Sequence, residues 1–213
     1  MEQLTLTGRL IRLEPLTLDH AEALAAASAA NPELSDDQIY KFTVVPQSID
    51  EATQYIQTAL EWQVDRTAIP FVIIRNSDNA IIGSTRYWGI ERWVWPAGHE
   101  RHGNPHPDVC DIGYTWYARS AIRSGANTEG KFLMLQHAFE VWNALRISLH
   151  TDSRNLRSQA SMETIGFKRE GVLRAHKLAV DNIARDSVRY SMIAAEWPAA
   201  KQRLVERLSA IRD

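Results

Sequence analysis

Ile122-Arg123-Ser124-Gly125-Ala126-Asn127-Thr128-Glu129-Gly130-Lys131 is the stretch that decides the fold, because it joins a strand-like run to a helical one. The strand-like run covers residues 111–117, and residues 131–142 have helical spacing. A glycine-bearing loop that opens a helix leaves backbone N–H groups unpaired, and the helix dipole favours negative charge there. The stretch therefore predicts a cradle for a phosphate-bearing ligand, with a plain turn as the alternative.

Composition limits the classes of protein that this chain can belong to. Its 213 residues are 45% hydrophobic and 23% charged, which predicts one domain over 1–213, with a core of about 4–198 and a C-terminal helix of about 196–212. The net charge of −2 is spread evenly, so we expect no nucleic-acid partner. No apolar run nears the roughly 18 residues of a membrane span, and the start lacks a leader, so we expect a cytoplasmic protein with no membrane partner.

The first half of the chain reads as a strand, two helices and a hairpin. Residues 6–13 alternate around Gly8, and a capped helix follows and ends at Asn31-Pro32. Ser48 is a plausible cap for a second helix. Residues 71–74 and 81–88, separated by a polar turn, then predict a β-hairpin.

The second half adds helices and strands that set the fold class. Four apolar residues at helical spacing after the opening stretch predict a core stripe that faces a sheet, not a cofactor contact: Phe132, Leu135, Phe139 and Trp142. A strand over 146–151, a short helix from Asn155 to Gly166, strands over 167–174 and 186–193, and an amphipathic helix over 196–211 follow. The order predicts an α+β fold with a mostly antiparallel sheet and one parallel crossover.

Residues 91–108 form an irregular loop rich in histidine and tryptophan. The spacings of three histidines and the single cysteine could suit a zinc site: His99, His102, His106 and Cys110. The close pairs of ligands that a structural zinc site needs are missing, so we expect a solvated loop and no metal. Trp93 and Trp95 are predicted to contact the substrate, because loops rarely carry tryptophan without a surface to cover or a ligand to pack on.

Several motifs in order resemble the GNAT acetyltransferase superfamily, and within it the ribosomal-protein N-terminal alanine/serine acetyltransferases. The resemblance covers about residues 4–198 and is carried by Ile112-Gly113-Tyr114-Thr115-Trp116, the stretch from Gly125 to Lys131, Asp152-Ser153-Arg154-Asn155-Leu156-Arg157-Ser158, Ile165-Gly166-Phe167 and Arg169-Glu170-Gly171-Val172-Leu173-Arg174. It implies a GNAT fold, with acetyl-coenzyme A as the acetyl donor and no metal.

The resemblance also implies which residues bind the coenzyme. The family's phosphate loop resembles Gln/Arg-x-x-Gly-x-Gly/Ala, and this chain departs from it at the first and last positions. The coenzyme contacts would come from the loop, from the next helix opening, and from a backbone N–H of one of two strand residues: Arg123, Ser124, Gly125, Ala126, Asn127 and Thr128; Asn155 and Ser158; Trp116 or Tyr117. Arg123 as a solvated surface arginine and Asn155 as a plain helix cap are the alternatives.

Two residues are candidates for the chemistry of acetyl transfer. Asp111 lies fourteen residues before Gly125, where related enzymes resemble this chain but carry a glutamate base. It would take a proton from the amine, or alternatively only bind a cationic substrate or form a salt bridge. The position of the family's tyrosine acid is Met162, so Ser158 takes the role of hydrogen-bonding the coenzyme sulfur. The rival bases are Glu91, Glu100, His99 and Asp108.

We therefore expect an N-acetyltransferase for a protein or peptide α-amine that acts by direct attack in a ternary complex. Alternation places Cys110 on the opposite face from Asp111, which disfavours an acetyl-cysteine route. Acids at Asp108, Asp111, Glu91 and Glu100 would suit a cationic acceptor. A small-amine acetyltransferase and a non-catalytic acyl-coenzyme A sensor are the alternatives, and the chain would be a monomer or a homodimer.

Overall fold

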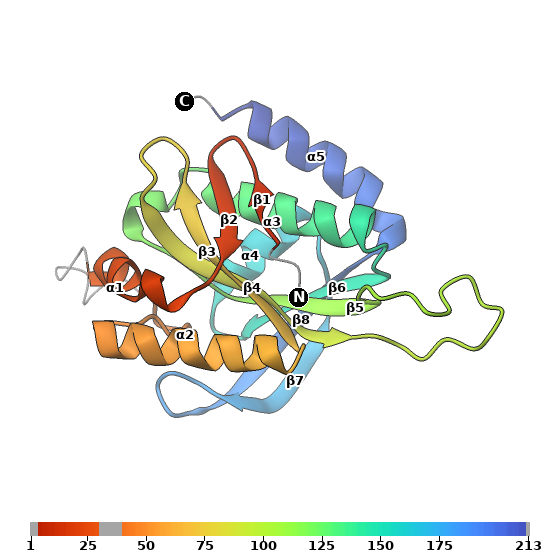
Figure 1. Ribbon diagram of the computed structural model, residues 1–213, viewed down its shortest axis with the longest axis horizontal. Coiled ribbons are helices and arrows are strands. Elements are labelled where there is room, and N and C mark those ends of the chain that lie inside the picture. The colour runs from red at the N-terminus through yellow and green to blue at the C-terminus, as the bar shows by residue number, and fades with distance from the viewer. Residues whose placement is uncertain (1–3, 30–39, 212–213) are drawn as a thin grey trace.

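The computed structural model describes residues 4–29 and 40–211 and contains an eight-stranded sheet in the order β1-β2-β3-β4-β5-β6-β8-β7 (Figure 1). The strands are β1 (Leu6–Thr7), β2 (Ile11–Pro15), β3 (Ala68–Arg75), β4 (Ile81–Glu91), β5 (Val109–Tyr117), β6 (Arg146–Asp152), β7 (Lys168–Leu178) and β8 (Ala184–Ile193). The helices are α1 (Ala21–Ala29), α2 (Ile49–Val64), α3 (Ala126–Gln136), α4 (Leu156–Ile165) and α5 (Trp197–Ser209), with a π-helical turn over His137–Val141 after α3.

The predicted α+β class is confirmed, because β5 and β6 are parallel and every other neighbouring pair is antiparallel. The single strand expected over residues 6–13 is wrong. The chain reverses after Gly8, whose N–H donates to Ile11 O at 2.9 Å, and Leu6 pairs with Leu13. The alternation of apolar and polar residues does not reveal this reversal, because β1 and β2 lie in one sheet and their apolar side chains point to the same faces of that sheet. The expected helix end at Asn31-Pro32 lies outside the described residues.

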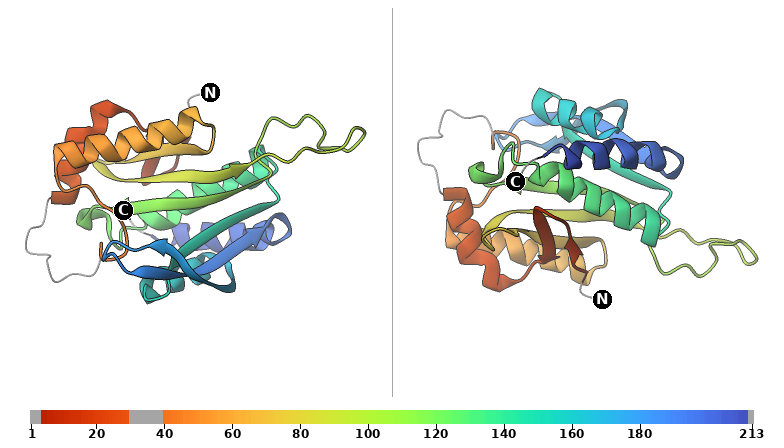
Figure 2. Two further views of the ribbon diagram at one scale, coloured as in Figure 1. Left: turned by 90° about the horizontal axis from the view of Figure 1, so that it is seen from below. Right: turned by 90° about the horizontal axis from the view of Figure 1, so that it is seen from above.

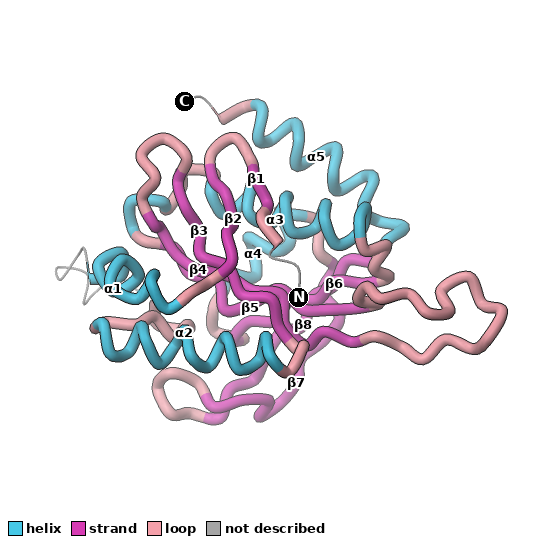
Figure 3. The backbone as a smooth tube through the Cα atoms, in the orientation of Figure 1, coloured by secondary structure: helices cyan, strands magenta, loops and turns pink. Residues whose placement is uncertain are grey.

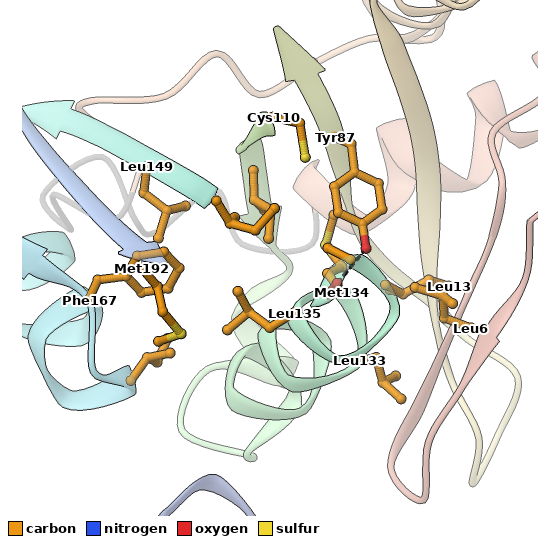
Figure 4. Close-up of a cluster of buried hydrophobic side chains, with 14 of the residues drawn as sticks. Leu6, Leu13, Tyr87, Cys110, Leu133, Met134, Leu135, Leu149, Phe167 and Met192 are labelled. Atoms are coloured by element: carbon orange, nitrogen blue, oxygen red, sulfur yellow. Dashed lines mark hydrogen bonds between the residues drawn. The ribbon is translucent and has the colours of Figure 1, made fainter. Parts of the chain in front are cut away.

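Helices cover both faces of the sheet. Figure 2 shows α1 and α2 on one face and α3, α4 and α5 on the other. The larger apolar core lies between the sheet and α3 (Figure 4), where the buried Tyr87 hydroxyl donates to Met134 O at 2.6 Å. A second core lies under α1 and α2. Ser48 caps α2 as predicted, since its side chain accepts from Glu51 N at 3.2 Å, a contact worth about 1 kcal/mol.

The apolar stripe of α3 is core, but it faces more than the sheet. Leu135 and Trp142 are buried, as predicted. Phe139, in the π-helical turn, is buried as well, and it and Phe132 also pack against Trp197 of α5, with ring centroids 5.7 and 6.1 Å away. The C-terminal helix therefore closes the outer side of α3 and holds it against the sheet.

The parallel strands β5 and β6 stay together over only three register pairs, which end at Asp111 opposite Ser148. Beyond these, residues 112–117 and 149–152 do not pair with each other, and the two strands diverge (Figure 2). Both strands run toward the same edge, so α3 and α4 begin beside the open end. The fold thus places two helix N-termini at the mouth of an opening whose closed end is Asp111.

Candidate active site

The loop before α3 has the conformation that an anion cradle needs. Gly125 caps the helix with a φ of +88°, and Arg123 also has a positive φ, of +63°. A Cβ at position 125 would collide with Ile211, so both the backbone angle and the packing require glycine here. Within the described part of the chain, the backbone N–H groups of Asn127 and Thr128 have no hydrogen-bond acceptor. They are free to bind an anion.

The start of α4 lies beside the start of α3. Asn155 caps α4, because its Oδ1 accepts from Ser158 N at 3.0 Å. One turn further on, Ser161 Oγ accepts from Asn127 Nδ2 at 3.3 Å, which joins the two helices. Ser158 is half-buried and lies on the turn between this link and the cap. The predicted loop residues and the predicted pair Asn155 and Ser158 are thus brought together by tertiary structure.

The main chain of β5 distinguishes Trp116 from Tyr117, the two strand residues predicted to contact the coenzyme through a backbone N–H. Ala118 N donates to Ile82 O of β4 at 2.7 Å. Because main-chain groups alternate along a strand, the N–H and C=O of Tyr117 point away from β4, toward the opening. Its carbonyl there accepts from the Tyr40 hydroxyl at 2.9 Å. The side chain of Trp116 is buried in the core under α1 and α2.

Asp111 stands where β5 and β6 part. Its side chain is 14% exposed, and its oxygens lie 3.7 Å from a terminal nitrogen of Arg189 and 3.7 Å from His150 Nδ1. Burial raises the pKa of Asp111, and Arg189 and Lys177 oppose that effect. A carboxylate with a raised pKa holds a proton more firmly and is a better base than an exposed aspartate.

Cys110 lies on the face opposite Asp111, as alternation predicts. It is 2% exposed within the core against α3, and burial raises the pKa of its thiol well above the ordinary value. His150, which lies beside Asp111, has its pKa lowered to about 3, first by burial and then by neighbouring cations. The imidazole is therefore neutral at physiological pH, and the thiol is not available as a nucleophile.

The loop between β4 and β5 projects from the body of the protein (Figure 3). Trp93 is 46% exposed, whereas Trp95 contacts other residues of the loop. Asp108 is 2% exposed and accepts from Trp93 N and from Trp95 Nε1, both at 2.8 Å. His99 stacks on Trp95 with ring centroids 4.3 Å apart. Asp108 therefore fastens the loop, which corrects its expected contribution to attracting a cationic acceptor. The described residues contain no group of three or more histidine, cysteine, aspartate or glutamate side chains able to hold a metal.

Three buried charges were not singled out from the sequence. Lys131 is 6% exposed and donates to Thr115 Oγ1 at 2.8 Å, and burial lowers its pKa to about 7. Glu129 accepts from three N–H groups of the turn between β1 and β2, at 2.7 to 2.9 Å. The third is Arg86 of β4, at 1% exposed. Charged residues in amphipathic segments are usually solvated, so no local signal marks these as buried.

The loop before α3, the parting of β5 and β6 and the carboxylate of Asp111 form a candidate site that would suit a long ligand with an anionic end. The comparisons with known proteins agree with this class. Residues 10–168 match the family described as acetyltransferase (GNAT) domain. The chain belongs to the GNAT acetyltransferase family.

Individual relatives match over different lengths. A Bacillus subtilis (strain 168) protein, YdaF, named provisionally as a ribosomal N-acetyltransferase, is 33% identical over 92 residues, which are 43% of this chain and 49% of that protein. A GCN5-related N-acetyltransferase from Brucella melitensis has a TM-score of 0.81 at 25% identity, covering 99% of this chain and 87% of that one. Mycobacterium smegmatis RimJ in complex with CoA-disulfide has a TM-score of 0.76 at 21% identity, covering 97% and 95%.

Among the helices of the described residues, none combines the length and the apolar character needed to cross a bilayer.

Proposed function

We propose that this protein transfers the acetyl group of acetyl-coenzyme A to a primary amine, namely the α-amine of a protein or peptide. The observation that carries the proposal is the opening between β5 and β6, with two helix N-termini at its mouth and Asp111 at its closed end. Family membership supports the donor, as does the complex of M. smegmatis RimJ with CoA-disulfide. The provisional name of YdaF, a ribosomal N-acetyltransferase, supports a protein amine as the acceptor.

The coenzyme would enter with its diphosphate on the loop over residues 123–128. The N–H groups of Asn127 and Thr128 would bind phosphate oxygens, and the exposed Arg123 would add a positive charge. The pantetheine arm would then follow β5 through the opening, where the main chain of Tyr117 points away from β4. The Tyr40 hydroxyl, which occupies the Tyr117 carbonyl, would yield that acceptor to an amide N–H of the arm.

The reaction would proceed by direct attack of the amine on the thioester. Asp111 would take a proton from the amine, directly or through a water molecule, and a C–N bond would form as the carbonyl oxygen gains negative charge. The N–H of Tyr117 lies six residues, or roughly 20 Å, along β5 from Asp111, so it would bind the pantetheine arm and not that oxygen. The C–S bond would then break, and the Ser158 hydroxyl would hydrogen-bond the leaving thiolate until it takes up a proton. Amide and coenzyme A are the products. The position of Cys110 on the opposite face favours this route over an acetyl-cysteine intermediate.

Two measurements test the proposal. Calorimetry with acetyl-coenzyme A should detect binding at millimolar ligand or below, and an isotopic assay should detect transfer to peptide α-amines. Transfer to polyamines or antibiotics alone would assign the protein to the small-amine acetyltransferases. Binding without transfer to any amine would make it an acyl-coenzyme A sensor, and no binding at all would overturn the enzymatic interpretation.

Ser158→Ala separates chemistry from binding at the same site. We expect turnover to fall about tenfold or more, in line with the loss of one hydrogen bond to a charged group, while the Kd of acetyl-coenzyme A changes little. Ser209→Ala on the exposed side of α5 is the control, since its hydroxyl only bonds Val205 O of its own helix. Equal turnover in Ser158→Ala and the parent enzyme would remove Ser158 from the mechanism.

A further inference from the structure

Arg86 of β4 is a buried cation in an aromatic cage. Its side chain is 1% exposed, and its Cζ lies 4.5 Å from the ring centroid of Tyr114, 4.8 Å from that of Tyr55 and 5.2 Å from that of Trp62. Two of these rings come from α2, so Arg86 points to the α2 face of the sheet. Aromatic faces attract a cation, but they accept none of the hydrogen bonds that a guanidinium offers.

The guanidinium has no acceptor in the described part of the chain. Its Nε is buried without a hydrogen-bond partner, and neither a carboxylate nor a carbonyl of the described residues bonds its terminal nitrogens. Burying a guanidinium in this way is costly, and cation–π contacts offset only part of that cost. A buried donor group left unsatisfied in an otherwise well-packed protein points to a ligand that completes it.

Arg86 lies on the same face as Asp111. Arg86 pairs with Gly113 and Trp88 pairs with Asp111, so alternation puts the Arg86 and Asp111 side chains on one face. The two positions are separated by two residues along adjacent strands, or roughly 7 Å. One acceptor molecule can therefore present an amine to Asp111 and an anionic group to Arg86.

Further cations surround this face, which makes a purely cationic acceptor a poor match. Lys177 Nζ lies 4.1 Å from the ring centroid of Trp88, and Arg189 has a buried Nε without a hydrogen-bond partner. Arg185, which lies on β8 as Arg189 does, is half-buried, and its Nε donates to Ser187 Oγ at 2.9 Å. The acids that interact with these cations include Asp111, Asp152 and Glu170, of which Asp152 is already bonded to Arg154 and Glu170 to Arg146.

We infer that the acceptor carries a carboxylate close to its reactive amine, and that Arg86 recognises this carboxylate through paired hydrogen bonds. This inference rests on the proposed function, because it assigns the acceptor of the same site. It narrows the acceptor to peptides with an aspartate or glutamate side chain within the first two residues. It also replaces the expectation of a cationic acceptor with that of an amine that bears its own negative charge.

The test uses matched acceptors that differ only in charge. Peptide pairs with glutamate or glutamine at the first or second position, and a free amino acid beside its C-terminal amide, would be compared by kcat/KM in the isotopic assay. We expect the carboxylate member of a peptide pair to be preferred about 10- to 100-fold, as for a hydrogen bond to a charged group. A preference seen only with the free amino acids would assign the carboxylate to a small acceptor and overturn the peptide assignment.

Variants show whether Arg86 causes the preference for the acceptor with a carboxylate. Arg86→Gln should abolish it, Arg86→Lys should retain part of it, and Lys201→Gln on α5 should leave it unchanged. The ratio of the two kcat/KM values is measured within one variant, so it does not depend on the fraction that folds. A wild-type ratio below about threefold, or an unchanged ratio in Arg86→Gln, would overturn the inference and leave Arg86 as a packing residue. Failure of the proposed function would look different, since no amine of either charge would be acetylated.

Discussion

Lys131 gives a prediction whose size can be worked out from the structure. Its ammonium is buried between α3 and β5, where it donates to the Thr115 hydroxyl, and burial lowers its pKa from the ordinary 10.5 to about 7. Each pH unit of such a difference corresponds to about 1.4 kcal/mol, so the charged form costs the folded state about 5 kcal/mol below pH 7.

The sign of the pH dependence follows from proton binding. Between pH 7 and 10.5 the unfolded chain holds a proton on Lys131 that the folded protein has released, so stability rises with pH across this window. From pH 6 to pH 9 the gain from this one group is about 3 kcal/mol. Lys131→Met removes the titration and loses one hydrogen bond of about 1 kcal/mol. We expect the variant to be more stable than the parent by about 4 kcal/mol at pH 6 and by about 1 kcal/mol at pH 9.

Urea denaturation of both proteins at several pH values between 6 and 9 measures the difference directly. Lys201→Met is the control, because that lysine is exposed on α5 and pairs with Glu140. Its stability difference from the parent should change little with pH over this range. If the difference between Lys131→Met and the parent is also independent of pH, Lys131 is not titrating in the folded protein and the reasoning from its burial fails.

Three other predictions follow from contacts of the site. Glu129→Gln should lower the free energy of unfolding by about 2–3 kcal/mol in urea, because three N–H groups lose a charged acceptor; an undiminished value would contradict this. Gly125→Ala should weaken acetyl-coenzyme A binding in calorimetry at least tenfold and lower the Tm, whereas Gly171→Ala, where a new Cβ meets nothing, should do neither. Because the pKa of Asp111 is raised, turnover should fall as the pH drops through that pKa. Asp111→Asn should lower kcat about 100-fold or more and should remove this decrease at acidic pH. If the decrease is still present in Asp111→Asn, it is caused by the titration of another group.

Features that depend on a few neighbouring residues could be predicted from the sequence. The cap of Asn155 on α4 and the glycine-bearing loop that opens α3 are decided within one turn of chain. The placement of Cys110 and Asp111 on opposite faces follows from the period of a strand. The same local reasoning failed at Gly8, where both strands of a hairpin keep one alternation.

The sites of Arg86, Lys131 and Glu129 could not be predicted in this way. Each is a charged residue in an amphipathic segment, and such residues are normally solvated. Glu129 reaches N–H groups more than a hundred positions earlier in the chain, at Arg9 to Ile11. Arg86 is covered by rings from α2 and from β5. Only long-range packing decides that these charges are buried and which of them lack a partner.

The sequence by itself determined the order of the elements except at the hairpin around Gly8, through local backbone preference and the period of strand and helix. The phosphate loop was predicted from its glycine before a helix, and Asp111 and Ser158 were proposed for the chemistry from the resemblance to the GNAT family. The tertiary structure decided that β5 and β6 part after Asp111, and that a cationic face surrounds that carboxylate. Strand divergence and burial arise from contacts between segments far apart in the chain, and such contacts leave no periodic trace in any one of them.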